Sequence, residues 1–409
     1  MRNTAFIIIL CLLPFLNSCE PANTENSNWR GTERTGFYAE TGLLSEWPEN
    51  GPELLWKYED LGKGFTSAAV TDKKIYITGT KDSTSFVTAL DHSGNLLWEK
   101  DFGLTWKNNY PGVRSTPVIL NGLGYVLTGR GVMVCFDIET GDKVWETDWA
   151  IHYNAIAPYF GFCENFLIDG EKIYCTPGDT LKYNVLALNR FNGQIIWESE
   201  GLHEISAYAS PTLITHNGQK QLVTFTSKSI IALNPENGEL KWSFDMGYPH
   251  GIHANIPIYE DGHIFAMNGW GFGSKMLKIS DDGTSVEEVW SSELFDLEHG
   301  DVLKIGENLY GSSWDKKVFS VVDWKTGAVK DSSRTIEPAS VISAEGLIYA
   351  YSYSGKVQLI KPTESSFEII SSFDAPGKRK DHIAHPVIKD KKLYIRYANK
   401  LLVYSIAIK

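Results

Sequence analysis

Hydrophobic and polar residues alternate along most of the chain in short runs that are separated by turn residues. Between residues 73 and 102 the runs "KKIYITGT", "SFVTALD" and "NLLWEKDF" have the period of two and the β-branched and aromatic content of half-buried β-strands. An Asp followed a few residues later by a Gly, as in "DHSGN", suits a hairpin turn, because glycine readily adopts a positive φ. The pattern predicts consecutive antiparallel strands joined by tight turns.

One version of this pattern recurs along the chain. It reads "ALDHSGNLLW", "FDIETGDKVW", "ALNRFNGQIIW" and "LNPENGELKW", and the tryptophans that end the repeats are spaced by 42, 47, 52, 45 and 48 residues. These tryptophans are Trp56, Trp98, Trp145, Trp197, Trp242 and Trp290. Such a period is typical of a propeller or a solenoid, and about four strands in each repeat make one propeller blade. We interpret the Trp, Gly and Asp of the repeat as packing and turn residues.

The number of blades follows from the strands that open each repeat. These predicted inner strands are 66–72, 115–121, 164–170, 210–216, 256–262, 301–307, 340–346 and 385–391. The last repeat supplies only three strands, and the segment 53–60 carries a Trp without a blade before it. We therefore predict an all-β fold: an eight-bladed β-propeller of four-stranded antiparallel blades over residues 51–409, closed by strand 53–60, which leaves no open edge.

The N-terminal residues have the pattern of a secretory signal. One basic residue precedes a short apolar run, and small and polar residues follow it before Cys19. The segment from Leu16 to Cys19 resembles a bacterial lipobox, so residues 1–18 are predicted to be a lipoprotein signal peptide and Cys19 the lipidated residue. The alternative is ordinary cleavage with Cys19 incidental. Residues 19–50 are expected to be a tether and lead-in, of which residues 20–28 read as flexible.

Composition excludes some classes of function. The formal net charge is −12, which argues against nucleic acid as a partner, because phosphate contacts need a basic surface. No cysteine and histidine spacing suggests zinc, and we predict no metal site. Cys163 and Cys175 could form a disulfide or remain buried free thiols.

The repeat "ALD…G…W" resembles the tryptophan-docking repeat of eight-bladed propellers of the pyrroloquinoline-quinone (PQQ)-like, or quinoprotein-dehydrogenase-like, family, over residues 53–409. The lead-in "NWRGTERTGFYAETGLLSEWPENGPELLW" resembles the opening of a polyvinyl-alcohol-dehydrogenase-like subgroup of lipoproteins and periplasmic proteins. The resemblance implies either a quinoprotein dehydrogenase or a non-catalytic propeller lipoprotein of the outer-membrane β-barrel assembly machine. The fold alone does not choose between them.

The candidate ligand-binding residues lie on one predicted face, where the connections between blades meet the loops between second and third strands. Seven of the ten histidines fall in these connections, together with aromatic and charged residues. The candidates are Trp106, Arg114, His152, Tyr153, Tyr208, His253, Asn255, Trp270, His299, Trp314, His382 and His385. Close-spaced pairs such as His253 with Asn255 are expected to face a central funnel together. The two interpretations are a polar ligand pocket and a structural plug of the ring's centre.

The enzyme alternative has little support in these residues. The resemblance implies PQQ held against a pair of adjacent cysteines, with calcium bound by Glu, Asn and Asp, and an Asp as base. The chain has no adjacent cysteines and no assignable calcium set, and only His299 and Asp301 are candidates for catalysis. No cofactor is predicted, and PQQ with calcium belongs to the alternative alone.

We therefore predict a monomeric, membrane-anchored, extracytoplasmic propeller that acts as a non-catalytic binding or scaffold module. Its expected ligand is a protein partner of the cell envelope, or a carbohydrate or small polar molecule in the funnel. The alternative is a PQQ-dependent or sugar-directed enzyme. The expected location is the Gram-negative outer membrane, on the periplasmic face or the cell surface, through the lipid anchor.

Overall fold

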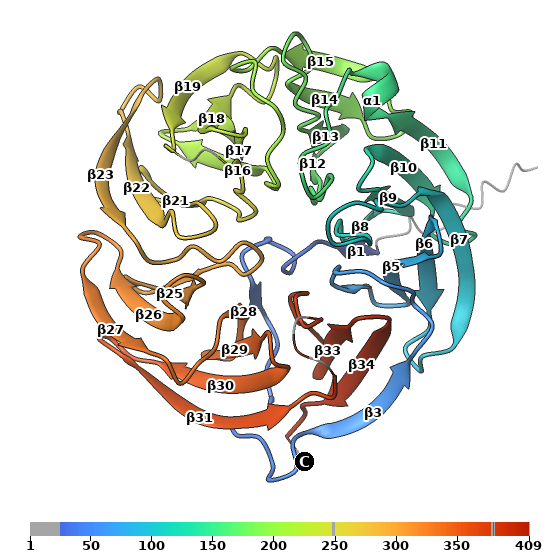
Figure 1. Cartoon of the computed structure of the whole chain (residues 1–409), viewed down its shortest axis with the longest axis vertical. Coiled ribbons are helices and arrows are strands. Elements are labelled where there is room, and N and C mark those ends of the chain that lie inside the picture. Colours follow the sequence, from blue (N-terminus) through green and yellow to red (C-terminus); the bar gives the residue numbers. More distant parts are fainter. Residues whose placement is uncertain (1–24, 248–249, 378, 380, 409) are drawn as a thin grey trace, which may run out of the picture.

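The computed structural model describes residues 25–247, 250–377, 379 and 381–408, and it forms eight antiparallel β-sheets arranged as the blades of a ring (Figure 1). The predicted fold class, an eight-bladed propeller with four-stranded blades, is confirmed. The expected signal peptide and Cys19 lie outside the described residues.

In blades 1 to 7 the four blade strands follow one another in chain order from the middle of the ring outward, and blade 8 takes its outermost strand from the N-terminal part of the chain. Blade 1 contains β4 (Ala69–Val70), β5 (Ile75–Lys81), β6 (Thr84–Leu90) and β7 (Leu96–Leu104), and blade 2 contains β8 (Val118–Leu120), β9 (Leu123–Leu127), β10 (Val132–Asp137) and β11 (Lys143–Asp148). Blade 3 contains β12 (Leu167–Asp169), β13 (Lys172–Cys175), β14 (Val185–Asn189) and β15 (Ile195–Ser199), and blade 4 contains β16 (Thr212–His216), β17 (Gln219–Phe225), β18 (Ser229–Leu233) and β19 (Leu240–Asp245). Blade 5 contains β20 (Ile258–Glu260), β21 (His263–Met267), β22 (Ser274–Ile279) and β23 (Val286–Ser292), and blade 6 contains β24 (Leu303–Ile305), β25 (Asn308–Ser313), β26 (Val318–Asp323) and β27 (Val329–Ser333). Blade 7 contains β28 (Ala339–Ala344), β29 (Leu347–Ser352), β30 (Lys356–Pro362) and β31 (Phe367–Asp374), and blade 8 contains β32 (Val387–Lys389), β33 (Lys392–Tyr397), β34 (Lys400–Ser405) and β3 (Glu53–Tyr58).

The first strand of each blade overlaps one of the eight predicted inner strands. One short helix, α1 (Trp149–His152), follows β11, and the Asp148 side chain caps it by accepting the backbone N–H groups of Ala150 and Ile151. Within the part of the chain that the structure describes, helical structure is nowhere long and apolar enough to span a membrane.

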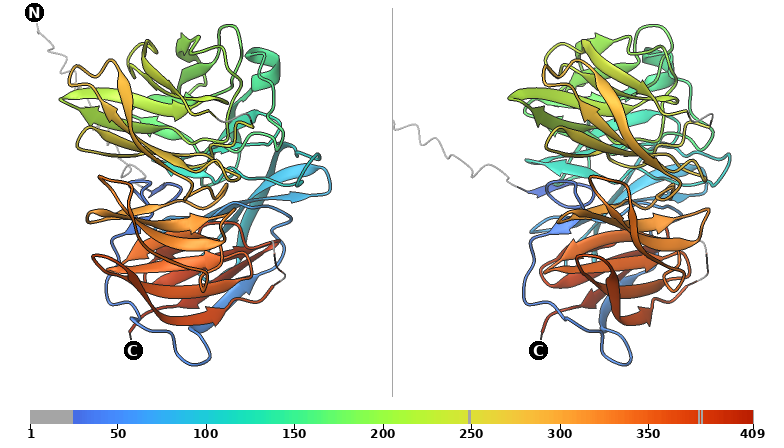
Figure 2. Two further views of the ribbon diagram at one scale, coloured as in Figure 1. Left: turned by 60° about the vertical axis from the view of Figure 1, so that its left-hand side comes forward. Right: turned by 90° about the vertical axis from the view of Figure 1, so that its left-hand side faces the viewer.

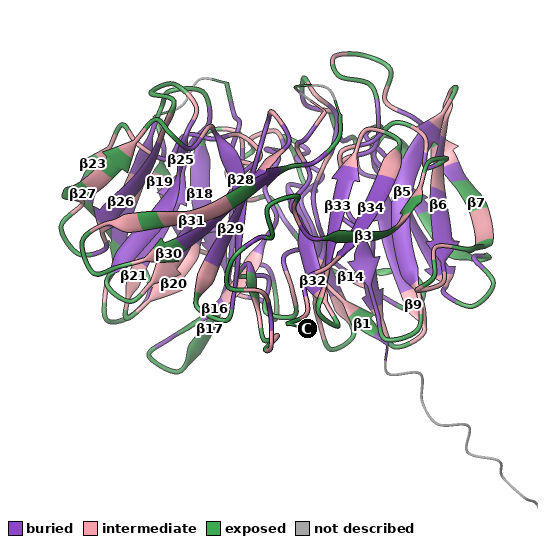
Figure 3. Cartoon of the chain, turned by 90° about the horizontal axis from the view of Figure 1, so that it is seen from below, coloured by how far each residue is buried: buried purple, intermediate pink, exposed green. Residues whose placement is uncertain are grey.

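Blade 8 joins the two ends of the described chain. Its outer strand β3 pairs antiparallel with β34, from Glu53 opposite Ser405 to Tyr58 opposite Leu401. Each sheet buries both of its faces against its neighbours, and exposed residues are concentrated on outer strands and loops (Figure 3). The ring is thus closed through hydrogen bonds between segments about 350 residues apart.

The repeated tryptophan docks one blade on the next. The indole N–H of Trp145 in blade 2 donates to the backbone oxygen of Arg190 in the turn of blade 3, at 2.9 Å. Trp56, Trp197 and Trp290 make the corresponding bonds to the following blades at 3.0 Å. The repeat residues therefore have the packing role that their pattern predicts.

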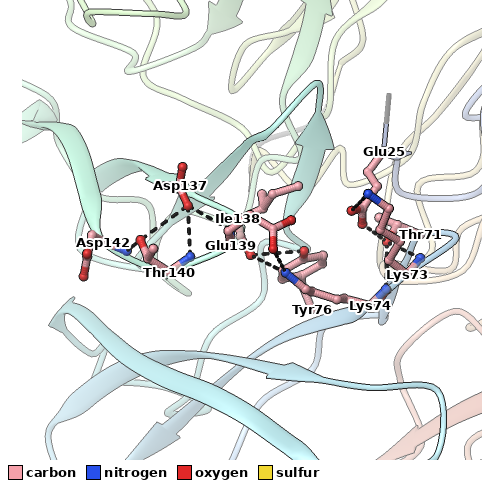
Figure 4. Close-up of polar contacts among 10 residues, drawn as sticks. All are labelled: Glu25, Thr71, Lys73, Lys74, Tyr76, Asp137, Ile138, Glu139, Thr140 and Asp142. Carbon is pink, nitrogen blue, oxygen red and sulfur yellow. Dashed lines mark hydrogen bonds and ion pairs between the residues drawn. The ribbon is translucent and has the colours of Figure 1, made fainter. Parts of the chain in front are cut away.

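The repeated Asp shapes the turn that receives the tryptophan. In blade 2 the Oδ1 atom of Asp137 accepts the backbone N–H groups of Glu139 and Thr140, at 2.8 and 2.9 Å (Figure 4). The side chain thereby closes the turn locally, as Asp and Asn commonly do. Lys74 of blade 1 reaches the same turn and pairs with Glu139, so the turn also connects neighbouring blades.

The lead-in differs from the expected flexible tether. The described residues from Glu25 onward pack against the propeller: β1 (Asn26–Ser27) adds a strand to blade 2 beside β8, and β2 (Phe37–Tyr38) pairs parallel with β28 of blade 7. Between them the chain crosses the middle of the ring (Figures 1 and 2). Arg34 is buried there and donates to the backbone oxygens of Asn165 and Pro211, each at 3.1 Å, and of Phe166.

The two interpretations of the cysteines are resolved in favour of free thiols. Cys163 and Cys175 are both free, as is the buried Cys135. The Cys163 thiol lies 3.5 Å from the backbone oxygen of Tyr208, whereas the Cys175 thiol lies 3.7 Å from the sulfur of Met133. Burial raises the pKa of the Cys163 thiol to about 12, which keeps it protonated and unreactive at neutral pH.

Candidate ligand-binding site

A cavity of about 350 Å³ lies on the axis of the ring, on the face that carries the connections between blades. Eight aromatic side chains contribute to its wall: Trp29, Phe65, Tyr110, Phe160, Tyr208, Trp270, Trp314 and Tyr353. They come from the lead-in and from connections and loops of several blades, so the complete ring is needed to build the site. Its size is at the lower end of small-molecule sites, which span roughly 300–1,000 Å³.

The lead-in closes this cavity from the opposite face of the ring. β1 and β2 pair with β8 and β28 close to the turns that follow those strands, on the face away from the blade connections. Trp29 lies between them, lines the cavity and contacts the His385 ring edge to face, with ring centroids 5.1 Å apart. The site is therefore a blind pocket and not an open channel.

Half of the candidate residues line the cavity: Arg114, Tyr208, Trp270, His299, Trp314 and His385. The other six candidates do not line the cavity and instead contact other protein groups: Trp106, His152, Tyr153, His253, Asn255 and His382. The structure thus contains both of the alternatives that the sequence left open, a pocket and a set of plugging side chains.

The residues outside the cavity make contacts within and between the blades. The His253 ring is fully buried and stacks on Phe225, with centroids 4.9 Å apart, and burial lowers its pKa to about 4. Asn255 donates to the backbone oxygen of Leu297 at 3.2 Å, and the His382 ring stacks on Tyr397. These side chains hold the connections in place.

Three other candidates also have structural contacts. His152 and Tyr153 both interact with the Thr147 hydroxyl, at 3.0 and 3.3 Å. Trp106 packs on the backbone of Gly129 and Gly161, where a Cβ atom would come within 2.6 and 2.8 Å of it.

The expectation that close-spaced pairs face the funnel together is wrong. His299 lines the cavity, whereas Asp301 does not, and neither His253 nor Asn255 does. The connections that carry these pairs are not extended strands, so residues two apart do not share a direction there.

Asp301 lies behind the cavity wall in a buried charge cluster. Its carboxylate forms an ion pair with the Arg30 guanidinium at 3.1 Å, and His385 Nε2 lies 3.8 Å from the same oxygen. Burial raises the pKa of the Asp301 carboxyl, and Arg30 partly offsets this shift. Burial together with the charge of Arg30 holds the pKa of His385 well below its ordinary range, so its imidazole is neutral.

His299 is the candidate for catalysis that faces the cavity. Its Nδ1 atom lies 3.0 Å from the Tyr353 hydroxyl, and burial lowers its pKa to about 3. It is therefore neutral at pH 7 and poorly suited to accept a proton there. Asp301 is engaged by Arg30, so the two candidates do not form an acid–base pair.

The residues of the site do not fit a calcium-bound quinone. Across the described ranges, no three His, Cys, Asp or Glu side chains come close enough to hold a metal ion. The Asp nominated as base is ion-paired with Arg30, and the Cys163 thiol at the wall has no adjacent cysteine.

The aromatic wall is what sequence reasoning missed. Phe65, Tyr110, Phe160 and Tyr353 all lie in or beside the connections and loops of the predicted face. The same location that singled out histidines could have found these four aromatic residues. Trp29 could not be found in this way, because the lead-in has no strand pattern that places it.

A family model described as outer membrane protein assembly factor BamB matches the chain over residues 42–158 and 83–333. The chain is also 26% identical over 211 residues to the outer membrane protein assembly factor BamB of Kangiella koreensis. That match covers 51% of this chain and 49% of the relative, so the chain spans about half the length of this curated relative.

Two solved structures share the fold. BamB from Moraxella catarrhalis superposes with a TM-score of 0.62 at 14% identity, covering 87% of this chain and 97% of that one. The quinohemoprotein alcohol dehydrogenase from Comamonas testosteroni gives a TM-score of 0.63 at 12% identity, covering 97% and 82%. Structural likeness therefore does not separate scaffold from enzyme. The family model extends over more than half of the sequence, and the chain accordingly belongs to the family of the outer membrane protein assembly factor BamB, with its PQQ-like propeller repeat.

Proposed function

We propose that this chain is a non-catalytic binding scaffold of the cell envelope that takes part in the assembly of outer-membrane proteins. Membership of the BamB family supports this role, and so does a cavity whose residues do not fit the quinone cofactor of the dehydrogenases. The proposal includes a lipid anchor at Cys19, a location at the outer membrane, a monomeric propeller and no cofactor.

The observation that carries the proposal is a set of exposed apolar side chains on the connections from blade 1 to blade 2 and from blade 2 to blade 3. Tyr110, Ile151, Ile156 and Tyr159, here called the apolar ridge, are 58%, 73%, 56% and 67% exposed. They belong to two blade connections that contact each other, since the Asn109 side chain donates to the backbone oxygen of Tyr159 at 3.4 Å. Large apolar side chains left exposed on two adjoining connections suit an interaction site, and we assign the ridge to a protein partner.

Replacing Ile156 by aspartate should weaken the binding of that partner by at least about tenfold, because a charge would be buried in an apolar interface. The measurement is the amount of outer-membrane assembly proteins that co-purify with the full-length chain from detergent-solubilised membranes. The matched control is Val329→Asp, since Val329 is 53% exposed on the outer strand β27, away from the ridge.

The control variant should retain its partners, whereas Ile156→Asp should lose them while keeping its thermal stability. If the full-length protein carries no outer-membrane assembly protein, the proposed role is wrong. If both variants retain their partners equally, the ridge is not the interface.

The quinone alternative makes a separate prediction. Incubation of the purified protein with PQQ and calcium, followed by desalting, should leave no quinone absorption, because among the described residues no three His, Cys, Asp or Glu side chains are placed to hold the metal that would compensate the carboxylates of PQQ. Retention of one PQQ per chain would overturn the non-catalytic role and restore the dehydrogenase alternative.

A further inference from the structure

The wall of the cavity contains two tryptophans whose loops are fixed by one buried carboxylate. Asp296 is fully buried, and its side chain accepts the backbone N–H groups of Gly271 and Trp314 at 2.6 Å each and of Asp315 at 3.1 Å. Its backbone oxygen accepts the N–H of Trp270 at 3.1 Å. A single residue thus positions the loops that carry Trp270 and Trp314.

Trp270 is held in a conformation that a bulky residue rarely adopts. Its φ is +53°, in the left-handed region, which is strained for a residue with a Cβ atom. It is also 38% exposed, so the strain is not compensated by complete burial of its ring. Strain of this kind concentrates at binding sites, where it preorganises a side chain for its ligand.

Polar atoms without partners lie among these aromatic rings. Oε2 of Glu298 and Nε2 of His299 are buried and have no hydrogen-bond partner among the residues that the structure describes, and both side chains line the cavity. An entirely apolar ligand would leave these atoms unpaired, which would weaken its binding. A ligand with hydroxyl groups would pair them.

The charges around the cavity favour a neutral ligand. The Arg114 guanidinium already donates to the backbone oxygens of Asn109 and Gly112, and the Lys317 ammonium lies 3.1 Å from the centre of the Trp314 ring. Glu298 would repel an anion, while Arg114 and Lys317 would repel a cation. The His299 imidazole is neutral and can exchange a hydrogen bond with a hydroxyl in either direction.

We propose that the cavity binds a neutral sugar ring, stacked against the indoles of Trp270 and Trp314 and hydrogen-bonded by Glu298 and His299. The C–H bonds on one face of a pyranose suit the electron-rich face of an indole, and its hydroxyls suit the unpaired atoms. Asp296 is a positioning residue, because it touches the two loops and not the ligand. This site goes beyond the proposed scaffold role, since the sugar occupies the cavity and the partner contacts the apolar ridge, which shares only Tyr110 with the cavity wall.

The test uses the full chain and a panel of D-glucose, D-galactose, D-mannose, N-acetyl-D-glucosamine and maltose, measured by isothermal titration calorimetry and saturation-transfer NMR. At least one of these sugars should bind the wild type. Glu298→Gln and Trp314→Ala should each weaken that binding by about tenfold, or about 1.4 kcal/mol. Asp296→Asn should weaken it too, and the NMR signals of Trp270 and Trp314 should broaden in that variant as their loops loosen.

Ile156→Asp on the apolar ridge and Val329→Asp on β27 are the matched controls and should bind the sugar as the wild type does, because neither side chain lines the cavity. Glu298→Gln preserves shape, so its result holds even if Trp314→Ala destabilises the fold. The proposal is overturned if no sugar of the panel binds, or if Glu298→Gln and Trp314→Ala both leave binding unchanged. We expect indole to displace a bound sugar. If indole binds and no sugar of the panel does, the cavity is instead assigned to an apolar side chain of a protein.

Discussion

Replacing Arg30 by alanine should lower the free energy of unfolding by about 3–5 kcal/mol at pH 7, because it leaves a buried carboxylate without its partner. Arg30 and Asp301 are 2% and 3% exposed and lie 3.1 Å apart. Their pair ties the lead-in to blade 6, on the far side of the ring from the strand β1 that precedes it. Urea denaturation of the wild type and the variant measures the difference.

The loss should become smaller as the pH falls. Burial raises the pKa of the Asp301 carboxyl, and Arg30 is a group that lowers it, so the variant should have a still higher pKa in the folded state. An acid whose pKa is higher in the folded than in the unfolded state makes stability fall as the pH rises through that interval. As the pH falls from 7, the unpaired carboxyl of the variant should take up a proton, and its difference from the wild type in free energy of unfolding should become smaller.

The matched control is Lys57→Ala, since Lys57 and Glu59 also lie 3.1 Å apart but are about half exposed. This variant should have nearly the same free energy of unfolding as the wild type, because exposed ion pairs contribute little to stability. The double variant Arg30→Met with Asp301→Leu should recover most of the lost stability, because it removes both buried charges. An Arg30→Ala protein as stable as the Lys57→Ala protein would show that the lead-in is held by other contacts.

The blade architecture was predictable because it depends on local pattern. Each blade repeats the alternation of apolar residues, the Asp turn and the docking tryptophan, and all of these lie within about 50 residues of one another. The segment 53–60 could be assigned to blade 8 because it carries the Trp of a repeat that has no other strands. Where a repeat lost its tryptophan, at Lys330, the strand alternation still marked the blade.

The lead-in was not predictable in the same way. The polar residues around Arg30 and Arg34 look like a solvated segment, yet both arginines are buried. Their partners are Asp301 and backbone oxygens of residues near 165 and 211, which no spacing in the sequence brings together. Trp29, which completes the cavity, depends on the same distant contacts.

The candidate site was predicted in its location but only in half of its residues. The connections do converge on the axis, as the alternating direction of the strands requires. Which side chains turn inward is decided by irregular backbone, such as the positive φ of Trp270 and the bonds of Asp296. A pattern of residue types does not reveal either of these features.

Replacing Gly193 by alanine should lower the free energy of unfolding by about 2–5 kcal/mol, from two separate causes. Gly193 has a φ of +71°, which costs roughly 1–2 kcal/mol for a residue with a Cβ atom. The new Cβ would also lie 2.8 Å from Cε3 of the Trp145 indole, which docks blade 2 on this turn. Moving a large ring in a packed interface costs typically about 1–3 kcal/mol more.

Gly218→Ala separates these two causes. Gly218 has a similar φ of +78° in the turn between β16 and β17, but nothing lies within 4 Å of the position that a Cβ would occupy. The Gly218→Ala variant should therefore lose only the part of the free energy of unfolding that comes from the strained backbone. The difference in free energy of unfolding between the two variants then measures what tryptophan docking contributes to one blade contact. Equal free energies of unfolding for the two variants would mean that the Trp145 indole moves aside without lowering the stability. The repeated tryptophan would then add little to the stability of the ring.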